Sequence, residues 1–551
     1  MPYVFERIWQ SRRESLRKRG DGVNAITTEA NRVVEWTLTS KSEYGDPDRQ
    51  VTLQAIFTCP AGRVLRVPAF WAGGNSWKLR YSSFRPGDHA FHTECSDLRN
   101  TDLHGVEGRL VVTGYRGANA LLRHGPIRVA EDKRHFEHLD KTPFLWLGDT
   151  WWMGLCERLD MAGFRELTAD RAQKGFNVVQ IVAGLYPDMP AFDARGRGEG
   201  GFPWQEGYRA LRSEYFDAAE KRIAHLVESG IVPCIVGAWG YHLPWLGIPK
   251  MKQHWRNLVA RFAAYPVVWC VAGEATMPYY LSETKEKDAE FQKRGWTEIA
   301  AYVRSIDPFG RMVTLHPGDS SRNVVDDTSV LDFDMLQTGH DDRRCIANTV
   351  ELLRASRSAT PTIPVIDGEV CYEGILDSCW ADVQRFMVWT CLLSGAAGHT
   401  YGANGIWQVN GDTEAYGPSP HGGNWGNRPW RQAAALPGST QVGLAKRLLE
   451  RFEWWRFEPH PEWAEYADPG DPPSRYEVPF AGGIPLEARV VYVPARRPVA
   501  LRALEPGVEY EASGFDPATG VDIPMRMSGD GVFSAPTGIE GDWVLTQRAL
   551  N

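Results

Sequence analysis

Hydrophobic and polar positions follow one another differently in three successive stretches of the chain. From about residue 28 to residue 130, short runs that alternate or stay apolar are separated by turn residues such as Pro60-Ala-Gly and Arg85-Pro-Gly-Asp. The clearest runs are Val33–Thr39, Val51–Thr58 and Gly108–Gly114. This pattern is typical of a small antiparallel β-sandwich. The charged segment Ala130–Lys141 that follows is expected to be a linker.

Between about residues 143 and 430, short apolar strands alternate with amphipathic helices. One helix is expected over Tyr215–Ser229, because apolar residues recur on one face and Gly230 can end it. Such alternation predicts parallel strands joined by helices. Eight strands are expected: Phe144–Asp149, Val178–Ala183, Val232–Trp239, Val267–Glu274, Met312–His316, Asp334–Gly339, Pro364–Glu369 and Gly398–Gly402.

Eight such units in fewer than 300 residues indicate a (β/α)8, or TIM, barrel. A doubly wound α/β sheet is the competing fold. It usually carries a glycine-rich phosphate loop after its first strand, and Gly148-Asp-Thr-Trp-Trp is not such a loop. The fold class is therefore α/β, a barrel flanked by two small β domains.

After Trp430 the pattern predicts a helix at about 439–455 and then strands again. Arg489–Val493, Val508–Ala512 and Asp542–Leu545 are the strands expected there. The expected domains are an N-terminal segment and β-sandwich (1–135), a catalytic barrel (136–435), and a helix plus C-terminal β-sandwich (436–551).

Composition narrows the classes of function. The 551 residues are 43% hydrophobic and 24% charged, with a net charge of -8, so a globular protein is expected and a nucleic-acid partner is not. The sequence has no run of about 18 apolar residues, so no membrane-spanning helix is expected. Met1–Arg13 lacks the apolar core of a secretory signal, and the nine cysteines form no compact framework, so we expect a cytoplasmic protein with reduced thiols.

Two of the expected strands end in a glutamate, Glu274 and Glu369. The carboxyl ends of barrel strands carry the chemistry in this fold. A pair of carboxylates there is what glycoside hydrolysis needs, one to protonate the leaving oxygen and one to attack or to activate water. An ion pair or a solvated charge is the alternative for each glutamate taken alone.

The residues around each glutamate suggest a different catalytic role for it. The apolar strand before Glu274 predicts partial burial, which raises a carboxyl pKa as a general acid requires. Glu369, with Asp367 expected on the same side of its strand, is predicted to be an ionised nucleophile. The fourth and seventh strands are nearly opposite in a barrel, so the carboxylates can approach to about 5 Å, the separation of retaining enzymes.

Other polar and aromatic residues also fall at predicted strand ends. We expect Asp149, His316 and His340 to bind sugar hydroxyls. The residues expected to shape the pocket are Trp239, Tyr372, Tyr401 and Trp407. The glycine-rich loop from Tyr186 to Trp204 is expected to cover the barrel mouth.

No metal or other cofactor is expected. The first strand carries Asp149 where a metal-dependent hydrolase would carry a His-x-His pair, and a Gly-x-Ser-x-Gly nucleophile elbow is missing. The pairs His89/His92 and His135/His138 lie in or beside the N-terminal β region, and solvated or core histidines are the favoured interpretation.

The barrel resembles the apiosidase-like glycoside hydrolases. The matching segments are Phe144-Leu-Trp-Leu-Gly-Asp-Thr-Trp-Trp152, Gly175–Gln180, Ala272-Gly-Glu274, Asp332–His340, Gly368-Glu-Val-Cys-Tyr-Glu373 and Gly395–Trp407. The N-terminal segment resembles the β-sandwich that commonly precedes this barrel. The tail, with Phe515–Gly520 and Asp542-Trp-Val-Leu545, resembles the collagen-binding-type β domain that commonly follows it.

The resemblance implies that Glu274 is the acid/base and Glu369 the nucleophile. In the apiosidases the fourth-strand acid is an aspartate after two glycines, whereas a glutamate follows Ala-Gly here. Gly273 also replaces the asparagine of the Asn-Glu pair found in many related barrels. These departures imply a different ring size or anomer of the sugar.

The expected function is a metal-independent, retaining, exo-acting glycosidase for an oligosaccharide or glycoside, with furanosides or unusual sugars favoured by family analogy. A non-catalytic carbohydrate-binding protein on an inactive barrel, a metal-dependent hydrolase and an inverting glycosidase are the alternatives. A homo-oligomer is also expected, since β-sandwich flanks often mediate self-association.

Overall fold

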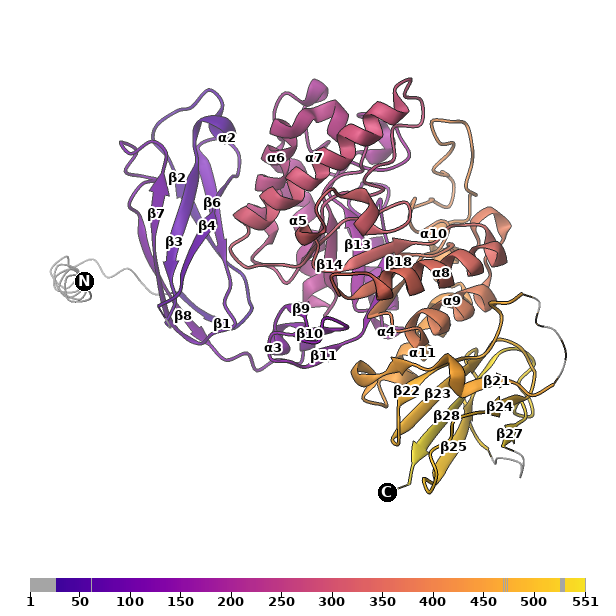
Figure 1. The fold of residues 1–551 in the computed structure, drawn as a ribbon. Helices are drawn as coiled ribbons and strands as arrows, with labels where there is room; N and C mark the ends of the chain where they lie inside the picture. Colours follow the sequence, from indigo (N-terminus) through magenta and orange to yellow (C-terminus); the bar gives the residue numbers. More distant parts are fainter. Residues whose placement is uncertain are drawn as a thin grey trace. The chain divides into compact units, whose positions relative to one another are not determined.

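The protein is described from a computed structural model, which describes residues 26–60, 62–468, 470, 472, 474–525 and 531–550. The stretch Met1–Arg13, in which no secretory signal is predicted, lies outside them. The chain divides into two compact units, the first ending at Arg116 and the second beginning at Gly117 (Figure 1). Each unit contains elements that the sequence pattern predicts.

The first unit is made of two β-sheets. Three of the expected strands are present, as β2 (Val34–Thr39), β3 (Leu53–Thr58) and β8 (Glu107–Thr113). The aromatic rings of Phe57 and Tyr81 stack in the core with their centroids 3.9 Å apart. One sheet has the order β1-β8-β7-β3-β4 and the other β2-β6-β5, with β1 (Ile26–Glu29), β7 (Gly87–Cys95), β4 (Val64–Pro68), β6 (Ser76–Tyr81) and β5 (Phe70–Trp71).

The second unit contains the eight-stranded barrel. Its strand order is β16-β15-β14-β13-β12-β19-β18-β17, and the neighbouring strands in this order are parallel. The strands confirm the predicted series. They are β12 (Trp146–Thr150), β13 (Val178–Val182), β14 (Val232–Val236), β15 (Val268–Cys270), β16 (Val313–Thr314), β17 (Asp334–Gln337), β18 (Val365–Glu369) and β19 (Gly398–Tyr401).

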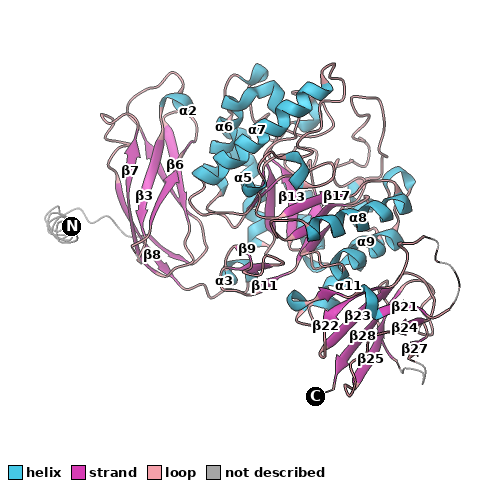
Figure 2. Ribbon diagram, viewed as in Figure 1, coloured by secondary structure: helices cyan, strands magenta, loops and turns pink. Residues whose placement is uncertain are grey.

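Helices surround these strands (Figure 2). The predicted helix over Tyr215–Ser229 is α5 (Ser213–Glu228), and Gly230 follows it with a φ of 79°, the left-handed conformation that glycine adopts at low cost. The other helices are α4 (Met161–Gln173), α6 (His242–Phe262), α7 (Lys285–Ile306), α8 (Cys345–Ser358) and α9 (Ala381–Leu393).

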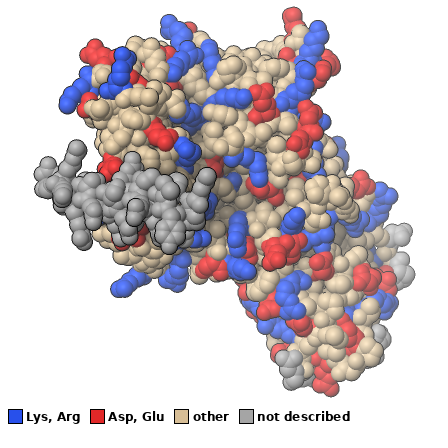
Figure 3. All heavy atoms as spheres, turned by 60° about the vertical axis from the view of Figure 1, so that its left-hand side comes forward, with Lys and Arg blue, Asp and Glu red and all other residues tan. Residues whose placement is uncertain are grey.

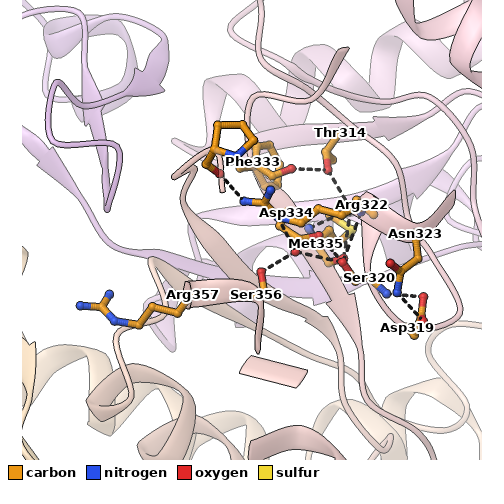
Figure 4. A network of polar contacts seen from close by, with 12 residues as sticks. Thr314, Asp319, Ser320, Arg322, Asn323, Phe333, Asp334, Met335, Ser356 and Arg357 are labelled. Carbon is orange, nitrogen blue, oxygen red and sulfur yellow. Dashed lines mark hydrogen bonds and ion pairs between the residues drawn. The ribbon is translucent and has the colours of Figure 1, made fainter. Parts of the chain in front are cut away.

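Side chains link β16 to β17, the two ends of the strand order (Figure 4). The hydroxyl of Ser321 donates to the carbonyl of Leu315 (2.6 Å) and accepts from the amide of Met335 (2.8 Å). The Ser320 hydroxyl lies 3.0 Å from both carboxylate oxygens of Asp334. This network holds the segment 315–333 that connects the two strands. His316 lies near the start of this segment, and Gln337 is the last residue of β17, which follows it.

The segment predicted as a linker, Ala130–Lys141, is instead part of a small sheet. Its strands, in the order β11-β10-β9, are β9 (Ile127–Val129), β10 (Phe136–His138) and β11 (Pro143–Phe144). Phe136 is fully buried, with its ring 5.2 Å from Phe333 and 5.8 Å from Trp146. The linker prediction was wrong because three buried residues among charged neighbours, Ala130, Phe136 and His138, are too short a pattern to recognise.

The C-terminal part begins with α11 (Pro437–Leu449), which ends earlier than the predicted 439–455. The predicted strands are present as β23 (Ala488–Val493), β25 (Tyr510–Phe515) and β28 (Trp543–Ala549). They belong to a sheet of order β20-β22-β23-β28-β25-β26, beside a second sheet β21-β24-β27. The remaining strands are β20 (Glu458–Pro459), β22 (Phe480–Ile484), β26 (Asp522–Pro524), β21 (Ala464–Tyr466), β24 (Val499–Leu501) and β27 (Val532–Phe533).

Of the helices that the structure describes, none is long and apolar enough to cross a membrane. All nine cysteines are free and buried. Acidic and basic side chains are interspersed over the face of the molecule drawn in Figure 3.

Candidate active site

Glu274 and Glu369 lie close together at the carboxyl ends of β15 and β18. Backbone hydrogen bonds between the segments 238–240 and 273 extend the β14–β15 ladder beyond the strands, so Glu274 follows directly after paired backbone. The side-chain amide of Gln337, the last residue of β17, donates to Oε1 of Glu274 (3.2 Å) and to Oε1 of Glu369 (3.3 Å). The two oxygens are therefore separated by no more than the sum of these lengths, about 6.5 Å.

Two histidines hold Glu369 in its ionised form. Nε2 of His340 lies 2.7 Å from Oε1, and Nε2 of His316 lies 3.0 Å from Oε2. Burial raises the pKa of Glu369, but the hydrogen bonds and charges of the two histidines outweigh it and lower that pKa to about 2. The lowered pKa favours the carboxylate form of Glu369.

The pKa of Glu274 is shifted in the opposite direction. Its burial, and then the negative charge of Glu369, raise the pKa of Glu274 above the usual glutamate value, against smaller opposing effects of His316, Gln337 and Trp239. Trp239 donates its indole N–H to Oε2 of Glu274 (3.1 Å). The φ of Glu274 is 39°, a left-handed conformation that costs free energy for a residue other than glycine and that often marks a functional position. The pKa values of the two glutamates are thus shifted in opposite directions.

The glycine before Glu274 makes room for Trp239. A Cβ on Gly273 would lie 2.2 Å from the Trp239 ring. The indole therefore packs where an asparagine at position 273 would need space, and its N–H supplies a hydrogen bond at the acid. Gly273 therefore leaves room for Trp239, which follows β14.

A shift in register before Glu369 separates it from Asp367. Between Leu336 and Gln337 the pairing of β17 with β18 skips one residue at Gly368. Oδ2 of Asp367 accepts from Thr338 (3.1 Å) and from the thiol of Cys391 on α9 (3.6 Å). The expectation that Asp367 shares a side of the strand with Glu369 is therefore wrong.

Aromatic side chains lie near Glu369 and its partner His340. The ring of Tyr372 lies 4.6 Å from that of His340 and 6.2 Å from that of Trp407. Trp152 donates its indole N–H to the Tyr372 hydroxyl (2.9 Å). Trp407 is 5% exposed, and its own indole N–H has no hydrogen-bond partner among the described residues. Apolar ring faces with an unused donor suit a sugar ring.

Asp149 and Tyr401, two residues predicted to contact the sugar, are engaged elsewhere. Asp149 is fully buried, and its Oδ2 accepts from Arg171 (2.6 Å) and from the indole of Trp151 (2.7 Å). The hydroxyl of Tyr401 donates to Glu373 (2.5 Å). These contacts give both residues a part in a buried polar network, in contrast to the expected sugar contacts.

Gln337 and Trp152 were missed by sequence reasoning. Gln337 lies within the predicted strand Asp334–Gly339 and ends the observed strand β17, but an amide gives no signal of chemistry on its own. Trp152 follows the end of the first strand, where its packing against Tyr372 depends on a contact across 220 residues of chain.

The histidine pairs considered for metal binding have other partners. His89 contacts the Tyr81 hydroxyl (3.0 Å) and the Arg85 carbonyl (3.0 Å). His135 pairs with Asp132, and His138 contacts the carbonyl of Gly125. In the described part of the chain, no three His, Cys, Asp or Glu side chains are grouped so that they could hold a metal ion.

A barrel with an acidic pair at the carboxyl ends of its strands is compatible with glycoside hydrolysis, and comparison with known proteins gives the family. Residues 130–456 match the model of the apiosidase-like catalytic domain, and residues 27–96 match a domain of unknown function (DUF5060). The chain belongs to the apiosidase-like family and is a glycosidase. No curated protein matches the chain.

Solved structures share the fold at low identity. A glycoside hydrolase has a TM-score of 0.62 and 23% identity, covering 77% of this chain and 97% of its own. A glycoside hydrolase family 5 protein from Bacteroides vulgatus gives the same score and identity, over 77% of this chain and 93% of its own. A further Bacteroides vulgatus structure, at TM-score 0.64 and 18% identity, covers 95% of this chain and 100% of its own.

Proposed function

We propose that the protein is a retaining glycosidase in which Glu369 is the nucleophile and Glu274 the general acid/base. The hydrogen bonds from one Gln337 nitrogen to both carboxylates carry this proposal. Retaining enzymes hold their two carboxyl groups about 5–5.5 Å apart, whereas inverting enzymes leave about 6.5–9.5 Å for a water molecule. The limit set by Gln337 favours the retaining geometry.

In the first step Glu369 attacks the anomeric carbon while Glu274 gives its proton to the leaving oxygen. The bond to the leaving group breaks and a glycosyl ester of Glu369 forms. The two histidines at Glu369 keep it ionised before attack, and the charge of Glu369 helps keep Glu274 protonated.

The second step reverses the role of Glu274. Esterification removes the negative charge of Glu369, which had raised the pKa of Glu274, so that pKa falls. Glu274 then takes a proton from water, the water oxygen attacks the anomeric carbon, and Glu369 leaves as a carboxylate. The product keeps the anomeric configuration of the substrate.

Exo action is supported by the loops over the strand ends. The loop after β13 and the segment 408–425 are linked, since Arg195 donates to the carbonyl of Pro418 (2.9 Å). Linked loops favour a pocket that accepts a chain end over an open cleft. The preference for furanosides or unusual sugars rests on family analogy alone.

A panel of 4-nitrophenyl furanosides and pyranosides tests the function. Wild type is expected to hydrolyse at least one glycoside, while Glu369→Ala and Glu274→Ala lose most of the activity. NMR of the first-formed anomer is expected to show retention, and azide is expected to restore turnover to Glu369→Ala with the opposite anomer. No hydrolysis by wild type would favour the alternative of a binding protein, and equal rates for wild type and Glu369→Ala would contradict the role of Glu369. An inverted first product would favour the inverting mechanism.

A further inference from the structure

Trp152, two residues beyond the end of β12, packs against partners of both glutamates of the site. The residue is buried, and its ring makes edge-to-face contacts with the rings of Trp239, at 5.3 Å between centroids, and His316, at 5.2 Å. The rings of Trp239 and His316 lie 6.0 Å apart, so the three form one cluster. Trp239 donates to Glu274 (3.1 Å), and Nε2 of His316 lies 3.0 Å from Glu369. One indole therefore contacts a partner of each carboxylate.

The indole N–H of Trp152 reaches a further partner of Glu369 through Tyr372. It donates to the Tyr372 hydroxyl (2.9 Å), and the Tyr372 ring lies 4.6 Å from the ring of His340. Nε2 of His340 lies 2.7 Å from Oε1 of Glu369. The place of Tyr372 is itself restricted, because a Cβ on Gly402 would lie 2.1 Å from its ring. Both histidines at Glu369 are thus connected to Trp152, one directly and one through a hydrogen-bonded tyrosine.

The backbone around Trp152 is held from both neighbouring strands of β12. The amide of Val182, the last residue of β13, donates to the Trp152 carbonyl (3.3 Å). The amide of Met153 donates to the carbonyl of Trp407 (3.0 Å), in the segment that follows β19. A buried ring on a fixed backbone has a defined position, so it can hold the side chains that pack against it.

The preceding residue, Trp151, is also buried but has different contacts. Its indole N–H donates to Asp149 (2.7 Å), and its ring lies 5.4 Å from the ring of Phe164 on α4. These contacts join the strand to the buried network of Asp149 and to the surrounding helices. The two adjacent tryptophans therefore support different parts of the protein, and Trp151 offers a matched control for Trp152.

We propose that Trp152 is a positioning residue, and that its indole holds the partners of both Glu274 and Glu369 in place. This rests on the proposed function. Attack at the anomeric carbon and protonation of the leaving oxygen belong to the same step, so the two carboxyl groups must be positioned relative to each other. A displacement of about 1 Å in such an arrangement can cost about 100-fold in rate. Trp152 acts through its neighbours and touches no reacting atom.

The contacts that Trp152 supports also affect the pKa values of the pair. Burial and then the charge of Glu369 raise the pKa of Glu274, and His316 and Trp239 oppose that rise. Burial also raises the pKa of Glu369, but the two histidines outweigh it. Looser packing around the indole should therefore raise both pKa values. The other titratable groups that face the pair are Asp367, Tyr372, His340 and Tyr280.

Trp152→Phe tests the proposal, because phenylalanine keeps an aromatic ring but removes the N–H and part of the contact area. On the 4-nitrophenyl glycoside that wild type hydrolyses fastest, we expect kcat/KM to fall by about 10-fold to 100-fold. Both limbs of the pH profile should move to higher pH, the acid limb with the pKa of Glu369 and the alkaline limb with that of Glu274. Trp151→Phe should lower the melting temperature and leave both limbs in place. An unchanged profile in Trp152→Phe, or equal shifts in both variants, overturns the proposal.

If Trp152→Phe does not fold, Tyr372→Phe tests the same contacts from the other end of the hydrogen bond. Loss of the hydroxyl releases the indole of Trp152, so the alkaline limb, which reports Glu274, should again move to higher pH. If Tyr372 acts on Glu369 alone, only the acid limb moves. Movement of the acid limb alone, or no movement of either limb, overturns the proposal.

Failure of the proposed function is visible separately. If wild type hydrolyses no member of the panel, the function fails, and the positioning role is measured in the free protein. NMR titration of protein labelled isotopically at its glutamate carboxyl carbons gives the two pKa values, with Glu274→Gln and Glu369→Gln to assign the signals. Higher pKa values of both carboxyl groups in Trp152→Phe than in wild type support the positioning role. A rise in only one of them, or in neither, overturns it.

Discussion

The carboxylates of Glu274 and Glu369 share a single neutral donor, the side-chain amide of Gln337. A lysine or arginine in that place would favour the ionised form of both acids. An amide bridges the two carboxylates without adding charge. The histidines can therefore lower the pKa of Glu369 while burial raises the pKa of Glu274. The neutral bridge is compatible with the proposed division between acid and nucleophile.

The first prediction concerns pH. Because Glu369 has a pKa of about 2 and Glu274 a raised one, kcat/KM should be high where Glu369 is ionised and Glu274 protonated. Activity is expected to fall as pH rises through the pKa of Glu274, which lies above the usual glutamate value. In Glu274→Gln, assayed with a 2,4-dinitrophenyl glycoside that needs no acid, this alkaline limb should disappear. An alkaline limb that persists would belong to another group, such as His340.

The second prediction concerns the bridge. The hydrogen bond from Gln337 lowers the pKa of Glu274, so Gln337→Leu should raise that pKa and move the alkaline limb to higher pH. Loss of the donor should also lower kcat/KM by about 10-fold to 100-fold, since it no longer positions the acid against the nucleophile. Gln337→Glu adds a third carboxylate to the pair and should lower activity further. An unchanged pH profile in Gln337→Leu would contradict the bridging role.

The sequence was sufficient to predict the barrel and its acidic pair, because short apolar strands ending in Glu274 and Glu369 form a local pattern. The partners of buried residues could not be predicted in the same way. Asp149 also ends a predicted strand, but its position depends on Arg171 from the helix that follows. Asp367 was misplaced because the register shift at Gly368 depends on how β18 pairs with β17.

The close packing of Gly368 against Met335 explains part of this register shift between β17 and β18. A Cβ at Gly368 would lie 2.3 Å from Met335, so the bulge needs glycine. A lone glycine in a strand pattern signals a bulge or a close approach of the backbone, but the pattern does not say which. The site residues that were missed, Gln337 and Trp152, have ordinary sequence contexts and are distinguished only by their neighbours in space.

The third prediction concerns Gly273. In Gly273→Ala the new Cβ would lie 2.2 Å from the Trp239 ring, so the indole must move and its hydrogen bond to Glu274 must lengthen. A displacement of this size at a catalytic group lowers kcat/KM by about 100-fold. The matched control is Gly318→Ala, where the added Cβ meets nothing within 4 Å and activity should stay at the wild-type level. Full activity in Gly273→Ala would show that the indole does not position the acid.

The last prediction separates a structural from a binding role for Asp149. The carboxylate and the guanidinium of Arg171 are both fully buried, and the distance between Oδ2 of Asp149 and Nε of Arg171 is 2.6 Å. Removing one member of a buried ion pair leaves the other charge uncompensated, which costs about 3–5 kcal/mol. Asp149→Asn should therefore lower the free energy of unfolding by about that amount in urea denaturation.

The KM of the Asp149→Asn protein that remains folded distinguishes the two roles of Asp149. If its part is structural, KM per folded molecule should stay within about twofold of wild type, because the sugar keeps all its hydrogen bonds. Asp170→Asn is the control, since Asp170 also pairs with Arg171 but its side chain is 33% exposed, so the substitution should cost about 1 kcal/mol or less. A KM raised tenfold at unchanged stability would place Asp149 against the sugar, because removing a hydrogen bond to a ligand weakens binding and leaves the free energy of unfolding of the free protein as it was.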